Sequence, residues 1–245
     1  MAVRYDPSIH WTEGHRMALR HRFALLGVVA LGGCGDAPIE PTAIDSPGGV
    51  SIHGEIWADN WFALYLGERL IVEDSTPITT ERSFNAESFV FNGDYPLQVN
   101  LVAKDFKEND TGLEYIGANN QQMGDGGFIA QFTDPASGQL IAASDTSWRC
   151  LTVHEAPLDR ACEEESDPRP GVAPCEFRAS SGPEGWMSPD FDDSAWPHAR
   201  EFSPATVRPK GGYDRIQWRQ EARLIWTADL ETHNTLLCRL TIPAP

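Results

Sequence analysis

The sequence has no apolar run long enough to cross a lipid bilayer as a helix. Its strongest apolar stretch, residues 23–31, has about nine residues, whereas a spanning helix needs roughly 20. This excludes an ordinary transmembrane segment at that point. The length is typical of the hydrophobic centre of a signal peptide.

Positive charge is also scarce. The chain has 19 Lys and Arg against 36 Asp and Glu, a formal net charge of -17. Residues 1–33 contain four of the basic residues and two of the acidic ones, so the remaining chain carries -19. This excess of acid argues against nucleic acid as a partner and against electrostatic docking on anionic lipid.

The common signatures of catalysis and of zinc binding are absent. There is no GxSxG elbow, no phosphate-binding loop, no GxGxxG after a strand and no CxxC pair. The histidines after residue 50 lack the i, i+2 or i, i+4 spacing of a metal cluster: His53, His154, His198 and His233. The sequence therefore predicts neither a recognised enzyme nor a zinc protein.

What is present is an export signal that ends at Cys34. Arg20 and Arg22 precede the apolar stretch, and Leu31-Gly32-Gly33-Cys34 follows it with the aliphatic, small, small, cysteine order of a bacterial lipobox. We expect residues 1–33 to be a signal peptide, with Met17 as the true start. Cys34 would then be diacylated with fatty chains such as palmitate and anchored to a membrane of the bacterial cell envelope, periplasmic or surface-exposed, since two or more chains anchor firmly.

Four further cysteines remain in the exported part of the chain. An even number in an oxidising compartment indicates two disulfides, although four cysteines allow three pairings. Cys162 and Cys175 flank an acidic, proline-rich loop, and Cys150 and Cys238 lie in strand-like runs. We predict the pairs Cys162–Cys175 and Cys150–Cys238.

Period-two alternation predicts an all-β fold. Residues 34–49 are rich in Pro, Gly and acids, so we expect a flexible tether there and a single β-sandwich over 50–245. Gly67-Glu68 offers a turn before another strand, and no long helical period with caps is present. An antiparallel β-sandwich follows from this pattern. The alternating apolar positions are Leu97, Val99, Leu101 and Ala103; Phe128, Ala130 and Phe132; and Leu236, Cys238, Leu240 and Ile242.

Three segments together resemble a known module. They are ADNWFALYLGERLI (58–71), the SDTSWRC end of segment 126–150, and GWMSPDFDDSAWPHA (185–199). They resemble the galactose-binding-like jelly-roll modules of bacterial glycoside hydrolases, especially the amino-terminal accessory domain of α-L-rhamnosidases. The resemblance implies a jelly-roll fold and suggests a sugar ligand, but Gly67-Glu68 replaces the usual Asn-Gly turn and this sequence has no catalytic barrel.

A candidate binding site follows from polar residues near aromatic ones. The loop 105–115 follows a predicted strand, and Trp57 and Trp61 flank an apparent bend. Carboxylates would accept hydrogen bonds from sugar hydroxyls while an aromatic ring covers the apolar face. The alternatives are a solvated loop and core tryptophans. The predicted saccharide site consists of Asp59, Trp61, Asp105, Asp110 and Glu114.

The same loop could hold calcium, which takes six to eight oxygen ligands. The candidate ligands are Asp105, Glu108 and Asp110, although their spacing is not that of an EF-hand.

Asp192 and Asp193 could form an acid–base pair for catalysis, but the carboxylates of adjacent residues rarely converge. We expect one of them to cap a turn that leads Trp196 into the core.

The sequence as a whole predicts a membrane-anchored lipoprotein with a non-catalytic β-sandwich that binds a carbohydrate or another envelope ligand. One alternative is a carbohydrate-active enzyme with an unrecognised site, which would need two convergent carboxylates in a cleft. The other is a structural envelope lipoprotein without a small ligand.

Overall fold

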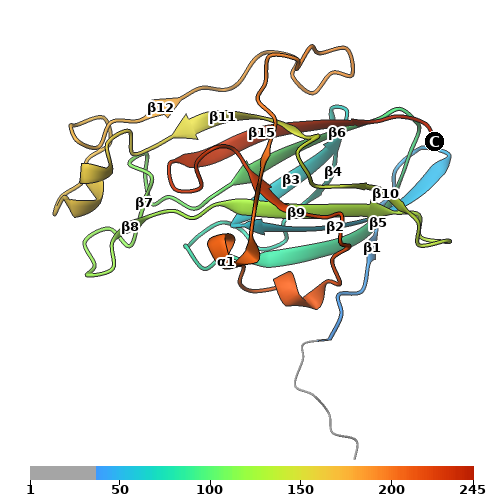
Figure 1. Cartoon of the computed structure of the whole chain (residues 1–245), viewed down its shortest axis with the longest axis horizontal. Coiled ribbons are helices and arrows are strands. Elements are labelled where there is room, and N and C mark those ends of the chain that lie inside the picture. The colour runs from blue at the N-terminus through green and yellow to red at the C-terminus, as the bar shows by residue number, and fades with distance from the viewer. Residues whose placement is uncertain (1–36) are drawn as a thin grey trace, which may run out of the picture. The chain divides into compact units, whose positions relative to one another are not determined.

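The computed structural model describes residues 37–245, and these form an antiparallel β-sandwich of two large sheets (Figure 1). We call them sheet A and sheet B. Sheet A has the order β1 (Thr42–Ala43), β5 (Asn85–Gly93), β2 (Val50–Asp59), β9 (Gly127–Thr133), β14 (Leu224–Trp226), β13 (Arg200–Phe202), and β10 (Leu140–Ala143) also pairs with β9. The predicted antiparallel all-β sandwich is confirmed.

Sheet B lies against sheet A. Its order is β12 (Arg178–Ala179), β11 (Arg149–Glu155), β15 (His233–Ile242), β6 (Leu97–Lys104), β3 (Trp61–Leu66), β4 (Arg69–Glu73). A small third sheet pairs β7 (Leu113–Glu114) with β8 (Gln122–Met123). The short helices are η1 (Arg160–Glu164), α1 (Pro204–Val207) and η2 (Tyr213–Arg215).

The chain crosses repeatedly between the two sheets. β2 ends at Asp59 in sheet A, and β3 begins at Trp61 in sheet B, so the crossing occupies a single intervening residue, Asn60. Asn60 is fully buried and donates its backbone N–H to the Lys104 carbonyl. Its side-chain Oδ1 accepts a hydrogen bond from the Phe106 N–H at 2.5 Å. These bonds hold the crossing against the end of β6.

The core lies between the sheets, as the alternation predicts. Its residues come from the inward faces of both sheets: Ile52, Ile56, Phe89, Phe91, Phe128 and Phe132 from sheet A, and Phe62, Leu64, Val99, Leu101 and Leu236 from sheet B. Gly54 shows how tightly this core is packed. A Cβ there would lie 2.6 Å from the Phe89 ring, so only glycine leaves room for that side chain.

The outer faces of both sheets are covered as well. On sheet A, the segment 204–224 packs over Trp57 and Ile129. On sheet B, the segment 182–197 packs Trp196 against Leu237 and Val153. The alternation of apolar and polar residues predicted strands with one exposed face. The covering segments also bury polar residues on the outer faces, such as Asn100 and Arg239, which are 0% and 2% exposed.

Both predicted disulfides are present. Cys150 and Cys238 face each other across β11 and β15, with their Cα atoms 4.1 Å apart. Cys162, which lies in η1, is joined to Cys175 with a Cα separation of 4.9 Å, and this bond closes the loop after η1.

The predicted tether is partly built into the sandwich. Thr42 and Ala43 pair in parallel with Phe89 and Val90 of β5. Ser46 is buried and donates to the Asn92 carbonyl at 3.2 Å. Unpaired edge strands of a sheet readily accept a partner, so sheet A extends back to Thr42, before residue 50. The signal peptide, Met17 and Cys34 lie outside the described residues.

Candidate functional site

The structure buries most of the predicted saccharide site. Asp59, Asp105 and Glu114 are 1%, 3% and 3% exposed. A sugar on the surface would need to reach the carboxylate oxygens, and these lie beneath other atoms. The shallow site predicted from Asp59, Trp61, Asp105, Asp110 and Glu114 is therefore not formed as an open surface.

The two tryptophans predicted to lie near the saccharide site differ in exposure. Trp57 is fully buried, donates its indole N–H to the Gly211 carbonyl at 3.0 Å and contacts the Tyr213 ring edge-on. It is a packing residue. Trp61 is half-buried at the start of β3, and the Lys104 ammonium lies 4.7 Å from the centre of its ring.

The three predicted calcium ligands do not come together, because Asp110 and Glu108 contact other groups. Asp110 accepts from Lys107 at 2.5 Å and lies 3.2 Å from the His154 ring nitrogen. Glu108 is exposed and accepts from the Ile116 N–H. Of the three proposed ligands, only Asp105 belongs to the group of acids whose oxygens lie within 4.8 Å of one another.

That group is a carboxylate cluster of Asp59, Asp105 and Asp125. Burial raises the pKa of Asp59 and of Asp105 well above the ordinary value, and the neighbouring acids raise both further. Burial also raises the pKa of Glu114 to about 7, although a hydrogen bond from Gln122 opposes the shift. Asp125 was not among the predicted residues; it lies in the loop before β9 and becomes their neighbour only on folding.

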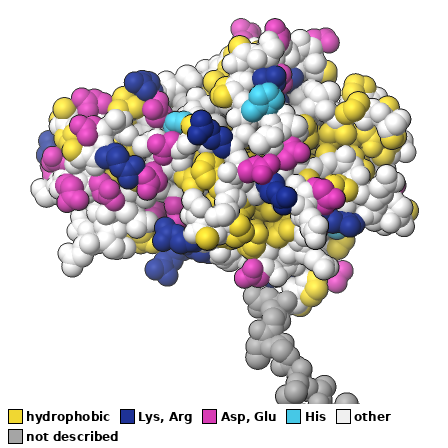
Figure 2. Space-filling view, viewed as in Figure 1, with side chains coloured by type: hydrophobic (Ala, Val, Ile, Leu, Met, Phe, Trp, Pro, Cys, Tyr) yellow, Lys and Arg dark blue, Asp and Glu magenta, His cyan; other side chains and the backbone are white. Residues whose placement is uncertain are grey.

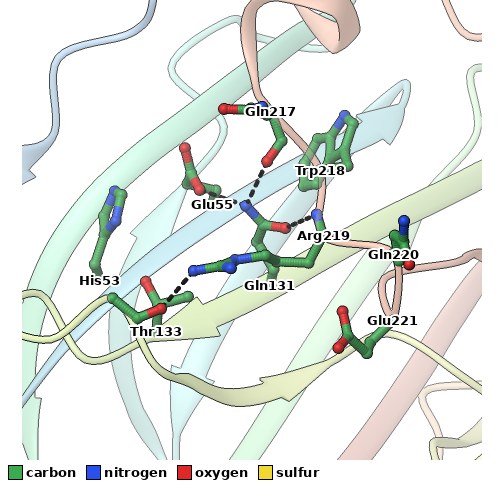
Figure 3. A pocket seen from close by; sticks show the side chains of 10 residues that line it. His53, Glu55, Gln131, Thr133, Gln217, Trp218, Arg219, Gln220 and Glu221 are labelled. Carbon is green, nitrogen blue, oxygen red and sulfur yellow. Dashed lines mark hydrogen bonds between the residues drawn. The ribbon is translucent and has the colours of Figure 1, made fainter.

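A second candidate site is a polar hollow on the outer face of sheet A, with a volume of ≈ 700 Å³ (Figure 3). Its floor comes from two neighbouring strands and its wall from the loop 217–221. Successive outward positions on β2 and β9 provide the floor, because residues two apart share one face of a strand. The lining residues are His53, Glu55, Gln131, Thr133, Gly138, Gln217, Trp218, Arg219, Gln220 and Glu221.

Hydrogen bonds fix the floor of the polar hollow. The buried Gln131 side chain donates to Glu55 Oε2 at 2.6 Å and to the Gln217 carbonyl at 3.3 Å. Its carbonyl oxygen accepts from the Arg219 backbone N–H at 2.7 Å. Gln131 therefore ties the floor to the wall and holds the Glu55 carboxylate in place (Figure 3).

The remaining side chains give the polar hollow its chemistry. Trp218 is half-buried, donates its indole N–H to the Tyr213 carbonyl at 3.1 Å and packs against the Tyr213 ring. The Arg219 guanidinium donates to the Gly138 carbonyl, and His53 shares a hydrogen bond of 2.8 Å with Ser88. The hollow thus combines one aromatic side chain with carboxylates, amides and a guanidinium.

Sequence reasoning missed the polar hollow. The run Gln217-Trp218-Arg219-Gln220-Glu221 carries an aromatic residue among four polar ones. Polar residues also alternate on β2 and β9 at His53 and Glu55, and at Gln131 and Thr133. These were the available signals, but nothing in the sequence shows that the three segments meet.

The motifs that carry the family resemblance have structural roles in this chain. Asp192 Oδ1 accepts from the Ser194 N–H at 2.9 Å, and Trp196 is 7% exposed, as expected for a capped turn that leads into a core. Asp145 caps a similar turn through Ser147, and Trp148 is fully buried. These residues position the chain rather than line either candidate site.

Comparisons with known proteins leave the family open. No protein-family model, no curated protein and no solved structure matches this chain. Within residues 37–245, none of the helices has the length and apolar character needed to span a membrane. The site geometry therefore carries the functional argument.

Proposed function

We propose that this chain is a lipid-anchored envelope protein whose non-catalytic, galactose-binding-like jelly-roll module binds carbohydrate through the polar hollow. The observation that carries the proposal is the half-buried Trp218 beside the fixed Glu55 carboxylate in one hollow. An aromatic ring covers the C–H face of a sugar, while carboxylates and amides accept and donate to its hydroxyls.

The lipid anchor is supported by the sequence around Cys34. The jelly-roll assignment is supported by the way the chain alternates between sheets: β2, β5, β9 and β14 belong to sheet A, whereas β3, β6, β11 and β15 belong to sheet B. The acidic composition is compatible with a neutral saccharide as ligand, because such a ligand requires no positive field.

A glycan-array screen of the full chain in detergent tests the proposal. We expect retention of one class of saccharide by the native protein, and its loss in Glu55→Gln. That substitution keeps an oxygen that accepts the Gln131 hydrogen bond, so the fold should persist. Glu68→Gln is the matched control, because it removes one exposed acidic charge at the turn between β3 and β4 in sheet B.

Two results would contradict the proposed site. The native protein could bind no glycan on the array, or Glu55→Gln could bind as tightly as the native chain.

A weaker candidate function, hydrolysis of a saccharide, is suggested by Glu55 and Glu221 lining the same hollow. Release of reducing sugar from the retained glycan, abolished in Glu55→Gln, would favour that alternative.

A further inference from the structure

The carboxylate cluster of Asp59, Asp105 and Asp125 lies where the two sheets are joined, and the saccharide proposal does not use it. Asp59 is the last residue of β2 in sheet A, and Asp105 directly follows β6 of sheet B. Asp125 precedes β9 of sheet A. Three segments far apart in the sequence thus bring carboxylate oxygens within 4.8 Å of one another.

Two of these side chains are buried, and residues 37–245 offer them no hydrogen bond. Both oxygens of Asp59 and both oxygens of Asp105 lie out of contact with solvent and accept no hydrogen bond from this described part of the chain. A polar group buried in this way is costly, and a buried carboxylate without a partner is costlier still. Two neighbouring carboxylates buried in this way need a positively charged occupant or bound protons.

The protein supplies little positive charge to the cluster. The Lys210 ammonium lies 3.6 Å from Asp125 Oδ2, and the Arg208 guanidinium lies 3.9 Å from the same oxygen. Both basic side chains are largely exposed, at 48% and 73%. In the described part of the chain no Lys or Arg forms an ion pair with Asp59 or Asp105, and Glu114 adds a further buried acid nearby.

The backbone around the cluster is shaped to leave the carboxylates room. A Cβ at Gly124 would lie 1.8 Å from Asp105 Oδ2, so this position tolerates only glycine while Asp105 keeps its place. Gly126, on the other side of Asp125, is similarly confined by the Trp226 ring at 2.7 Å. Gly124 therefore lets the chain pass close to Asp105, and Gly126 lets it pass close to the Trp226 ring.

We propose that Asp59, Asp105 and Asp125 bind one hard divalent cation, calcium, which ties sheet A to sheet B at the Asn60 crossing. All three ligands are oxygens, and oxygen ligands select calcium or magnesium over the softer transition metals. Calcium fits better, because it accepts irregular sets of carboxylates, carbonyls and water, whereas magnesium requires near-ideal octahedral geometry. The proposal is independent of the saccharide site, which lies at outward positions of β2 and β9.

The test uses the full chain in detergent after treatment with a chelator. Titration calorimetry should find one calcium per chain, and about 1 mM calcium should raise the melting temperature by several degrees, since a ligand that binds only the folded state stabilises it. Terbium provides a direct readout. It replaces calcium and should show luminescence sensitised by Trp226, whose ring lies beside Gly126.

Asp125→Asn is the informative variant, because Asp125 is partly exposed and its replacement should leave the fold intact. We expect calcium to bind at least about tenfold more weakly and the terbium signal to fall, since one charged ligand is lost. Glu108→Gln is the matched control. It neutralises an exposed acid on the 105–115 loop outside the carboxylate cluster and should bind calcium like the native chain.

Several outcomes would overturn the proposal. Native chain that binds no calcium would show that protons neutralise the acids. Equal calcium affinity in Asp125→Asn and the native chain would place the metal elsewhere. Saturation by magnesium at lower concentration than calcium would reject the calcium assignment. Calcium binding with no glycan retention would uphold this inference and reject the saccharide proposal, so the two fail separately.

Discussion

At the scale of single residues, the protein keeps several carboxyl groups in environments that oppose their ionisation. Asp74 is an example outside the carboxylate cluster: it is 4% exposed, and its Oδ2 accepts no hydrogen bond from residues 37–245. Burial raises the pKa of Asp74 from 3.8 to about 7, and the charge of Glu87 adds to the increase, while a hydrogen bond from the Thr76 N–H opposes it. The folded state therefore holds a proton here that the unfolded chain releases near pH 4.

This predicts a pH-dependent effect of Asp74→Asn. Because the folded pKa is the higher one, the native chain loses stability as pH rises from about 4 to about 7, and the loss is complete above that range. Asparagine does not ionise, so the variant should match the native chain near pH 4 and exceed it at pH 8 by on the order of 4 kcal/mol, because each unit of pKa difference is worth about 1.4 kcal/mol. Urea denaturation at several pH values measures this. The exposed Asp190→Asn is the control, and parallel curves for Asp74→Asn and the native chain would refute the expectation.

Two adjacent aspartates make a second prediction at the residue scale. Asp193 Oδ2 accepts from the Arg239 guanidinium at 2.9 Å, and Arg239 is 2% exposed. Asp193→Ala would leave a buried cation without its charged partner and should cost about 3–5 kcal/mol in the free energy of unfolding. Asp192→Ala, next to it, removes only a hydrogen bond at an exposed turn and should cost much less. Equal losses in the two variants would contradict this assignment, and equilibrium denaturation in urea decides it.

At the scale of elements, the two disulfides stabilise different parts of the sandwich. Cys150–Cys238 joins neighbouring strands of sheet B across 88 residues of sequence, whereas Cys162–Cys175 closes a loop with a separation of 13. In the chain-entropy model the longer loop gains more from closure. The first bond therefore supports the sandwich, and the second ties the loop 163–174 to η1.

Paired serine substitutions test this difference. Cys162→Ser with Cys175→Ser should lower the free energy of unfolding by about 3 kcal/mol, and Cys150→Ser with Cys238→Ser by about 4–5 kcal/mol. Limited proteolysis provides a second readout. The first double variant should be cut within residues 163–174 while the sheets resist cleavage, and cleavage spread evenly over the chain would show that this disulfide supports more than its loop.

At the scale of the whole molecule, charge is distributed unevenly. The net charge is -17, and many acidic side chains gather at the end of the sandwich near β7, β8 and η1, on the left of Figure 2. Basic side chains are interspersed among them. Such a surface favours solubility over binding to anionic lipid or nucleic acid. This surface gives no electrostatic attraction to an anionic membrane, and the proposed lipid at Cys34 would supply attachment by another route.

Cys34→Ala tests that anchor. We expect the native protein in the membrane fraction with a mass increased by acyl chains, and the variant either released or left unprocessed, because the acylated sulfur is lost. Gly33→Ala is the control, since alanine keeps a small residue before Cys34 and should preserve lipidation. Unchanged mass and fractionation of Cys34→Ala would reject the prediction.

Residue order by itself predicted the β-sandwich, several of its core strands and both disulfides. Alternating apolar residues such as Val99 and Leu101 can bury one face only by packing against a second sheet. Four cysteines allow only three pairings, and the sequence around each cysteine favoured the pairing that forms. The turn role of Asp192 was predictable too, because an aspartate that caps a turn acts on residues next to it in sequence.

Only the tertiary structure decided where the candidate sites lie. Asp59, Asp105 and Asp125 meet because the chain crosses between sheets at Asn60 and returns through the loop before β9. Glu55 and Trp218 share one hollow because the segment 204–224 covers part of sheet A and leaves the rest open. Burial and convergence of distant side chains depend on how whole segments pack, and local patterns of polarity do not specify that packing.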